Sequence, residues 1–264
     1  MSNYNLVDMK PGAPDLGVRV RLLEGFQLSI DGRPLELPPA SERLVAYLAL
    51  QPRPMVRSHV AGVLWGERKE ERAAACLRSA IWRTNSGHAP VLDAGRSRIG
   101  LHPDVSVDVR DAATAAHQQL SGTGVPVDPV ILMGELLPGW YDDWVLVERE
   151  RLRQLCLEAM EQMAVALLAA GQAGLAIEAA LGVITAEPLR ESAHRVLIDA
   201  HVESGNRGEA LRQFERCRAV LWDQLRLQPS EALAAAAARA HGPAAVTQAA
   251  REAVSTMTLG AAPA

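Results

Sequence analysis

What this chain of 264 residues lacks excludes several classes of protein. Charged residues or glycines interrupt its longest apolar runs, well short of the roughly 20 residues that a membrane-spanning helix needs. The stretch from Met1 to Pro14 lacks the basic region and following hydrophobic run of a secretory signal. We therefore expect a cytoplasmic protein with no membrane partner.

Cysteine is scarce, and its spacing fits neither a disulfide framework nor a zinc site. The three cysteines, Cys76, Cys156 and Cys217, are an odd number, lie far apart and form no CxxC pair. Such cysteines are typical of reduced thiols in a cytoplasmic protein. We predict that all three lie in helices, mainly as packing residues.

Motifs for nucleotide chemistry and catalysis are also missing. The sequence contains no GxxxxGK[ST] loop and no GxGxxG unit. Asp142 and Asp143 are adjacent, so they do not share a helix face, and they fit better as negative charge at the start of the next helix. His194 and His201 can share a face, but no third ligand has a suitable spacing. We therefore predict no enzymatic activity, no cofactor and no metal.

Charge is distributed unevenly along the chain, whose net charge is -4. The section from Asp15 to Ala112 has 14 basic and 12 acidic residues, whereas the section from Ala113 to the end has 12 basic and 18 acidic residues. Within the first section, Arg43 to Arg98 holds 10 basic and 4 acidic residues. A local excess of positive charge suits a polyanionic partner.

The stretch Glu71–Thr84 lies in the middle of this basic section and has the period of an amphipathic helix. Its apolar stripe is Ala73, Leu77, Ala80 and Ile81, and its opposite stripe is Arg72, Ala75, Ser79 and Arg83. A helix in a DNA major groove needs arginines that reach phosphates and base edges, and small residues that allow close approach. A solvated surface helix would show the same stripe, so the neighbouring elements must decide between the two.

The elements before this helix predict a small sheet and two short helices. Apolar residues alternate with polar ones over 18–22 and 26–30, and a third short strand is expected at Leu35–Leu37 after the turn signal Asp31-Gly32. Ser41 is then expected to cap one helix, and Ser58 a second.

The elements after this helix predict an arginine-bearing hairpin. Strand patterns occur at 91–92, 96–99 and 105–109, with a turn at 93–95. Three helices followed by such a hairpin are typical of a winged helix-turn-helix, in which the third helix reads the major groove. The side chains expected at the groove or its phosphates are Arg72, Arg78, Ser79, Trp82 and Arg83, and those expected on the wing are Arg96 and Arg98.

The second half of the chain predicts a helical repeat domain. A long helix is expected over 148–170, and Gly171 and Gly205 then open two similar segments that are 34 residues apart, the tetratricopeptide period. Before them, Trp140 and Trp144 with Tyr141 suit either a ligand pocket or an apolar anchor that caps the helical domain, and the anchor is favoured.

Two groups of segments resemble one family, the Streptomyces antibiotic regulatory proteins. The first group is Gly62–Gly66, Leu77–Arg83 and Val105–Val109, which resemble its OmpR-like DNA-binding half. The second is Val147–Arg153, Glu187–His194 and Gly205–Leu211, which are similar to its bacterial transcriptional activator domain. Cys76 stands where Asn or Thr is expected in the family, and Thr84 where an apolar residue is more usual.

The resemblance implies a sequence-specific transcriptional activator that binds direct repeats near a promoter, with a secondary-metabolite gene cluster as its expected target. Its implied partners are double-stranded promoter DNA, RNA polymerase with its sigma factor, and a second copy on DNA. The expected fold is an α+β winged helix-turn-helix with small antiparallel sheets, followed by an all-α tetratricopeptide-like domain. The expected limits are a flexible N-terminus over 1–17, the winged domain over 18–112, a helix end and linker over 113–128, the helical domain over 129–241 and a flexible tail over 242–264.

One alternative function belongs to a different class. The repeats would bind a peptide or small effector, and the winged helix would serve as a protein-binding module. Replacing Arg83 and Arg98 by Ala would separate the two hypotheses, because loss of promoter binding supports the activator and intact regulation without DNA binding supports the alternative.

Overall fold

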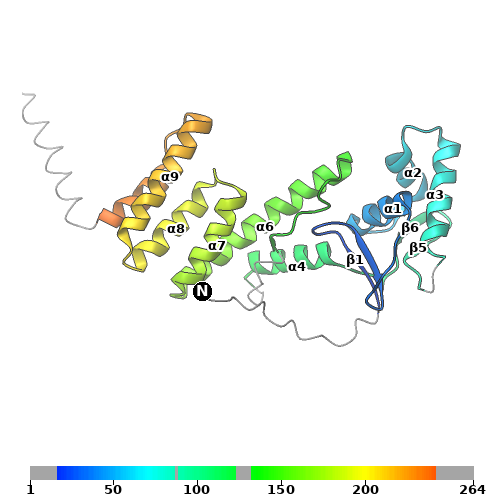
Figure 1. Cartoon of the computed structure of the whole chain (residues 1–264), viewed down its shortest axis with the longest axis horizontal. Coiled ribbons are helices and arrows are strands. Elements are labelled where there is room, and N and C mark those ends of the chain that lie inside the picture. The colour runs from blue at the N-terminus through cyan, green and yellow to red at the C-terminus, as the bar shows by residue number, and fades with distance from the viewer. Residues whose placement is uncertain (1–16, 87–88, 123–131, 242–264) are drawn as a thin grey trace, which may run out of the picture. The chain divides into compact units, whose positions relative to one another are not determined.

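The computed structural model describes residues 17–86, 89–122 and 132–241 (Figure 1). The predicted flexible ends fall almost wholly outside this range, as does the second half of the predicted linker. The chain forms two compact units. The first comprises Met1–Thr114 with Gly134–Gln154, and the second comprises Ala115–Met133 with Leu155–Ala264. The units are therefore discontinuous, whereas the limits expected from the sequence were contiguous.

The first unit begins with a sheet of order β3-β2-β1-β7. β1 (Val18–Arg21), β2 (Gln27–Ile30) and β3 (Arg33–Pro34) are antiparallel. Asp31 and Gly32 have φ of 50° and 75°, as a tight hairpin turn requires. This turn puts Arg33 and Pro34 directly in the ladder, so the prediction of a strand at Leu35–Leu37 was wrong.

β7 (Ser106–Val107) closes the sheet by pairing in parallel with β1, rather than extending the hairpin. The predicted strand at 105–109 is cut short because Asp108 begins α4 (Asp108–Leu120). Its carboxylate accepts hydrogen bonds from the backbone N–H groups of Leu22, Leu23 and Val109 at 2.7–3.0 Å. Asp108 thus joins the start of a helix to the end of β1.

Three helices follow the first sheet strands: α1 (Pro39–Leu50), α2 (Arg57–Trp65) and α3 (Glu70–Thr84). The predicted caps were wrong, because Pro38 and Val56 hold the N-cap positions of α1 and α2 and neither makes a side-chain cap bond. Ser41 is fully buried inside α1, where its hydroxyl donates to the carbonyl of Ala80 at 3.3 Å. Its role is to join α1 to α3.

A second sheet of order β4-β6-β5 forms the wing. β5 (Leu92–Ala94) and β6 (Arg98–Leu101) are the predicted hairpin, and β4 (Met55–Val56) pairs antiparallel with β6 from the other side. β4 immediately precedes α2, so the wing is tied to the helices by backbone pairing.

The second unit is all helical. α6 (Asp143–Ala169) begins in the first unit and continues into the second, followed by α7 (Ala173–Ala186), α8 (Glu191–Glu203), α9 (Arg207–Leu225) and a helical stretch over 231–241. Gly171 and Gly205 both have φ of +74°, in the turns that precede α7 and α9. The architecture is a winged helix-turn-helix with small sheets, joined to a tetratricopeptide-like helical domain, as predicted. No described helix is both long and apolar enough to cross a membrane.

Candidate nucleic-acid interface

α3 has one buried face and one exposed, mainly polar face. Ala73, Leu77 and Ala80 are at most 4% exposed, which matches the predicted apolar stripe. The opposite side of the helix is exposed and carries five of the predicted site residues: Arg72, Arg78, Ser79, Trp82 and Arg83. Trp82 is 72% exposed, although it is a large aromatic side chain. The arrangement presents three guanidinium groups and one indole to solvent from a helix whose other side is fixed.

One hydrogen bond within α3 and a pair of hydrogen bonds to the wing define the C-terminal end of this helix. Thr84 is 1% exposed, and its hydroxyl donates to the carbonyl of Ala80 at 2.9 Å, so a polar residue can fill an apolar position without leaving a donor unpaired. Asn85 follows the helix and exchanges two hydrogen bonds of 2.8 and 3.0 Å with the backbone of Leu92 in β5. The C-terminal end of α3 is thereby attached to the wing.

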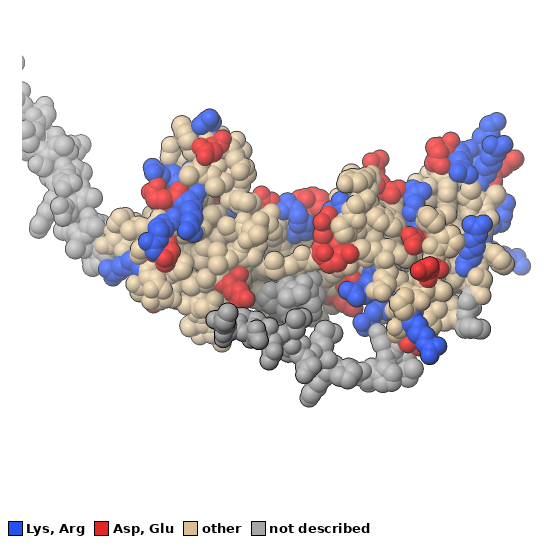
Figure 2. All heavy atoms as spheres, viewed as in Figure 1, with Lys and Arg blue, Asp and Glu red and all other residues tan. Residues whose placement is uncertain are grey.

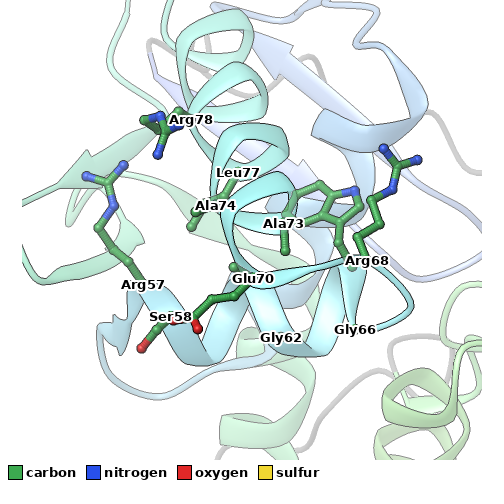
Figure 3. Close-up of a pocket in the computed structure, with 12 residues that line it drawn as sticks. Arg57, Ser58, Gly62, Gly66, Arg68, Glu70, Ala73, Ala74, Leu77 and Arg78 are labelled. Carbon is green, nitrogen blue, oxygen red and sulfur yellow. The ribbon is translucent and has the colours of Figure 1, made fainter.

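α2 and α3 enclose a hollow of about 530 Å³ at the surface (Figure 3). Arg57 and Arg78 extend along one side of it, and Arg68 lies on the other side. Glu70, in the first turn of α3, is the acidic residue among those that line the hollow. Space-filling atoms show basic side chains gathered over the part of the first unit that holds α2 and α3 (Figure 2). This surface offers positive charge and a recess bordered by small residues.

Arg96 and Arg98, the predicted wing residues, are both exposed. They differ in their contacts, because the Nη1 atom of Arg98 donates to the carbonyl of Pro54 at 3.1 Å. Arg57 makes a similar link, from its Nη1 to the carbonyl of Gly95 in the wing turn at 3.1 Å. The sequence prediction missed Arg57, since nothing in its neighbouring residues indicates a partner in the wing.

The segment with Trp140 and Trp144, predicted as an anchor of the helical domain, belongs to the first compact unit in the structure. Trp140 stacks on Phe26 with ring centroids 6.2 Å apart, and Trp144 meets Tyr47 edge-on at 5.3 Å. The backbone N–H of Leu137 also donates to the carbonyl of Leu22 at 2.9 Å. The aromatic residues therefore serve as an anchor, as favoured, but they attach to the sheet and α1 of the first unit.

Charged groups reinforce this anchor. Arg43 in α1 donates to a carboxylate oxygen of Asp142 at 2.5 Å and to the carbonyl of Leu64 at 3.2 Å. Arg149 in α6 donates to the carbonyls of Leu136 and Leu137. Asp142 is thus an ion-pair partner and Asp143 is the first residue of α6, which agrees with a structural role for both carboxylates.

The two histidines considered as metal ligands make other contacts. His194 is 3% exposed and lies between the carbonyl of Pro188 (3.0 Å from Nε2) and the amide of Gln213 (2.7 Å from Nδ1). Burial lowers the pKa of both His194 and His201. The described residues include no group of three or more side chains suited to hold a metal ion.

The cysteines all lie in helices, as predicted. Cys156 in α6 and Cys217 in α9 are buried, and burial raises the pKa of each thiol to about 11. Cys76 in α3 is partly exposed and accepts a hydrogen bond from Arg68 at 3.4 Å.

Comparison with known proteins places these observations in context. Residues 132–240 match the family model of the bacterial transcriptional activator domain. Comparison with curated protein sequences gives no match. Among solved structures, the chain is similar to Mycobacterium tuberculosis EmbR in complex with a low affinity phosphopeptide, with a TM-score of 0.67 and 23% sequence identity. That likeness covers 84% of this chain and 64% of the EmbR chain, so this chain spans somewhat less than two thirds of that protein's length.

Proposed function

We propose that the chain is a sequence-specific DNA-binding transcriptional activator without enzymatic activity. The observation that carries the proposal is the exposed face of α3, which presents Arg72, Arg78 and Arg83 from a helix held by a buried opposite face. Among the described residues, none forms a hydrogen bond or ion pair with these three guanidinium groups. Cations left unpaired on a rigid helix are suited to phosphates and to guanine edges.

The helical unit supports the activator half of the proposal. Its residues match the bacterial transcriptional activator domain, a description that fits a protein acting on transcription after DNA has been bound. We propose double-stranded promoter DNA and RNA polymerase with its sigma factor as partners. We further propose direct-repeat operators, occupied by two copies, and target genes in a secondary-metabolite cluster.

Binding to the chain's own promoter region tests the proposal. The protein should bind that duplex more tightly than a scrambled duplex of equal length at physiological salt. Base contacts add binding free energy to that of the phosphate contacts, which do not depend on sequence. Equal affinity for both duplexes would refute sequence-specific binding.

Substitutions on α3 show which surface is responsible. Arg78→Ala and Arg83→Ala should each weaken promoter binding, and a side chain that contacts guanine should contribute about 1–3 kcal/mol of discrimination. Arg195→Ala removes an exposed arginine from α8 in the helical unit and serves as the matched control. If regulation in cells survives while DNA binding by the α3 variants is lost, the winged helix is instead a protein-binding module.

A further inference from the structure

The outward face of α9 has no partner in the described part of the chain, although it carries a large aromatic residue. Its inward face packs in the core of the helical unit through Ala210, Gln213, Cys217 and Leu221. At 100° per residue, Glu215 and Ala219 lie about 155–165° from the mean direction of these four, and Trp222 lies about 135° from it. They form a ridge, which we call the α9 ridge, and Arg226 continues it just past the end of the helix.

The C-terminal part of the α9 ridge carries exposed apolar side chains beside a hollow that is lined mainly by polar residues. Trp222 is 46% exposed, and Leu225 and Leu227 beside it are 48% and 55% exposed. The guanidinium of Arg226 lies 5.7 Å from the centroid of the Trp222 ring, so the indole is held against the helix end. A hollow of about 390 Å³ adjoins the indole, and its lining includes Arg218, Ala219 and Asp223. A fixed indole beside a recess over a small residue is suited to receive an aromatic side chain.

We infer that the α9 ridge binds the α9 ridge of a second copy, with the two helices antiparallel. In an antiparallel pair related by a two-fold axis, residues on one flank of a helix face residues on the same flank of its partner. Arg216 and Asp223 lie on the same flank of α9, about 20° apart on the helical wheel. An axis that crosses between residues 219 and 220 therefore sets Arg216 of each copy opposite Asp223 of the other.

The same axis also fits the apolar centre. Trp222 of one copy then lies between the levels of Glu215 and Ala219 of the second copy, and Ala219 leaves room for the indole. Within the described part of one chain, Asp223 has no ion-pair partner, so its charge is available to a second copy. Basic and acidic side chains are intermixed over the region of α9 in Figure 2, which suits a self-complementary surface better than a polyanion.

This pairing does not depend on the proposed DNA binding, so its test contains no DNA. Sedimentation velocity of the full chain over a concentration series should show a reversible monomer–dimer equilibrium. Trp222→Ala should weaken the dimer about tenfold or more, because each dimer loses two buried indoles. Tyr141→Ala, which removes an aromatic side chain that is 79% exposed in the first unit, should leave the equilibrium unchanged.

Charge reversal tests the antiparallel register. Arg216→Asp and Asp223→Arg should each weaken the dimer, because each places like charges opposite one another twice. The double variant restores both pairs in reversed polarity and should recover most of the association. Circular dichroism of every variant checks that the helices are intact. A wild-type chain that sediments as a monomer, or a double variant no better than the single ones, would overturn the inference.

Discussion

At the scale of single residues, the two wing arginines are expected to contribute to DNA binding in different ways. Arg96 has no bonding partner among the described residues, whereas Arg98 donates to Pro54 and so holds β6 to the chain before α2. Arg96→Ala should remove a phosphate contact and lower the slope of log Kobs against log salt by about 0.9. Arg98→Ala should weaken binding with little change in slope, because it loosens the wing.

Filter binding of one promoter duplex over a salt series measures both effects. Arg98→Lys offers a further comparison, since an ammonium keeps the charge but does not reproduce the planar guanidinium. If Arg98→Ala lowers the slope as much as Arg96→Ala does, then Arg98 contacts phosphate directly.

The exposed residues of the candidate site were easier to predict than the residues that support them. The period of α3 alone places Arg72 and Arg83 on the stripe opposite the apolar one, and both are exposed in the structure, as is Arg78 beside Leu77. Arg57 was missed because its hydrogen bond to Gly95 joins residues that are far apart in the sequence. Contacts of this kind depend on how β4, β5 and β6 pair, which no local pattern reveals.

His194 makes the stability of the helical unit depend on pH. Burial lowers its pKa in the folded state, while the carbonyl of Pro188 and the charge of Glu191 act in the opposite direction. The unfolded state therefore binds the proton more readily than the folded state. The stability contributed by neutral His194 is fully present above the unfolded-state pKa of about 6.5. It is lost as the pH falls from there through the lower pKa of the folded state.

Thermal unfolding between about pH 7.5 and pH 5.5 tests this effect. The melting temperature should fall with pH, and His194→Asn should reduce the dependence. The dependence should not vanish, because burial also lowers the pKa of His201. A wild-type melting temperature that is constant over this range would contradict the argument.

At the scale of elements, the repeat turns depend on two glycines. Gly171 and Gly205 have φ of +74°, where a side chain is disfavoured although nothing lies within 4 Å of an added Cβ. Gly171→Ala and Gly205→Ala should each destabilise the fold by about 1–2 kcal/mol, purely through backbone strain. Gly174 lies within α7 with equally open surroundings, so Gly174→Ala should instead stabilise by about 0.5–1 kcal/mol.

Urea unfolding curves give these differences directly. The three variants are chemically the same change, so an effect of the same sign in all three would show that side-chain packing, and not φ, determines the outcome.

The elements themselves were largely predictable, and the errors have definite causes. The 34-residue spacing correctly placed the turns before α7 and α9, because both need a residue with positive φ. Ser41 was misjudged as a cap because its hydroxyl is used by Ala80, a contact between helices. β4 was missed because a strand of two residues shows no period and exists only by pairing with β6. The contacts of Trp140 with Phe26 and of Trp144 with Tyr47 were not predicted, since aromatic content does not identify the surface on which a segment packs.

At the scale of the whole molecule, the α9 pairing and the proposed operator architecture constrain each other. A two-fold axis relates two copies that pair through α9, whereas direct repeats relate DNA-bound copies by a translation along the helix axis. Copies that keep two-fold symmetry throughout can occupy inverted sites but not adjacent direct repeats. Pairing through α9 should therefore couple copies at inverted or well-separated sites.

Duplexes with two sites in either orientation test this coupling. On inverted sites the wild type should bind cooperatively. Asp223→Arg should abolish the cooperativity while affinity for a single site stays the same, because the proposed DNA contacts all lie on α3 and the wing. On adjacent direct repeats, any cooperativity should survive Asp223→Arg, because contacts between the two copies must then be made by surfaces other than α9. The double variant Arg216→Asp, Asp223→Arg should behave like the wild type on both duplexes.

Two outcomes would contradict this coupling. If Asp223→Arg weakens binding to a single site, α9 affects the DNA-binding unit itself. If cooperativity on inverted sites persists in that variant, a surface other than α9 joins the two copies.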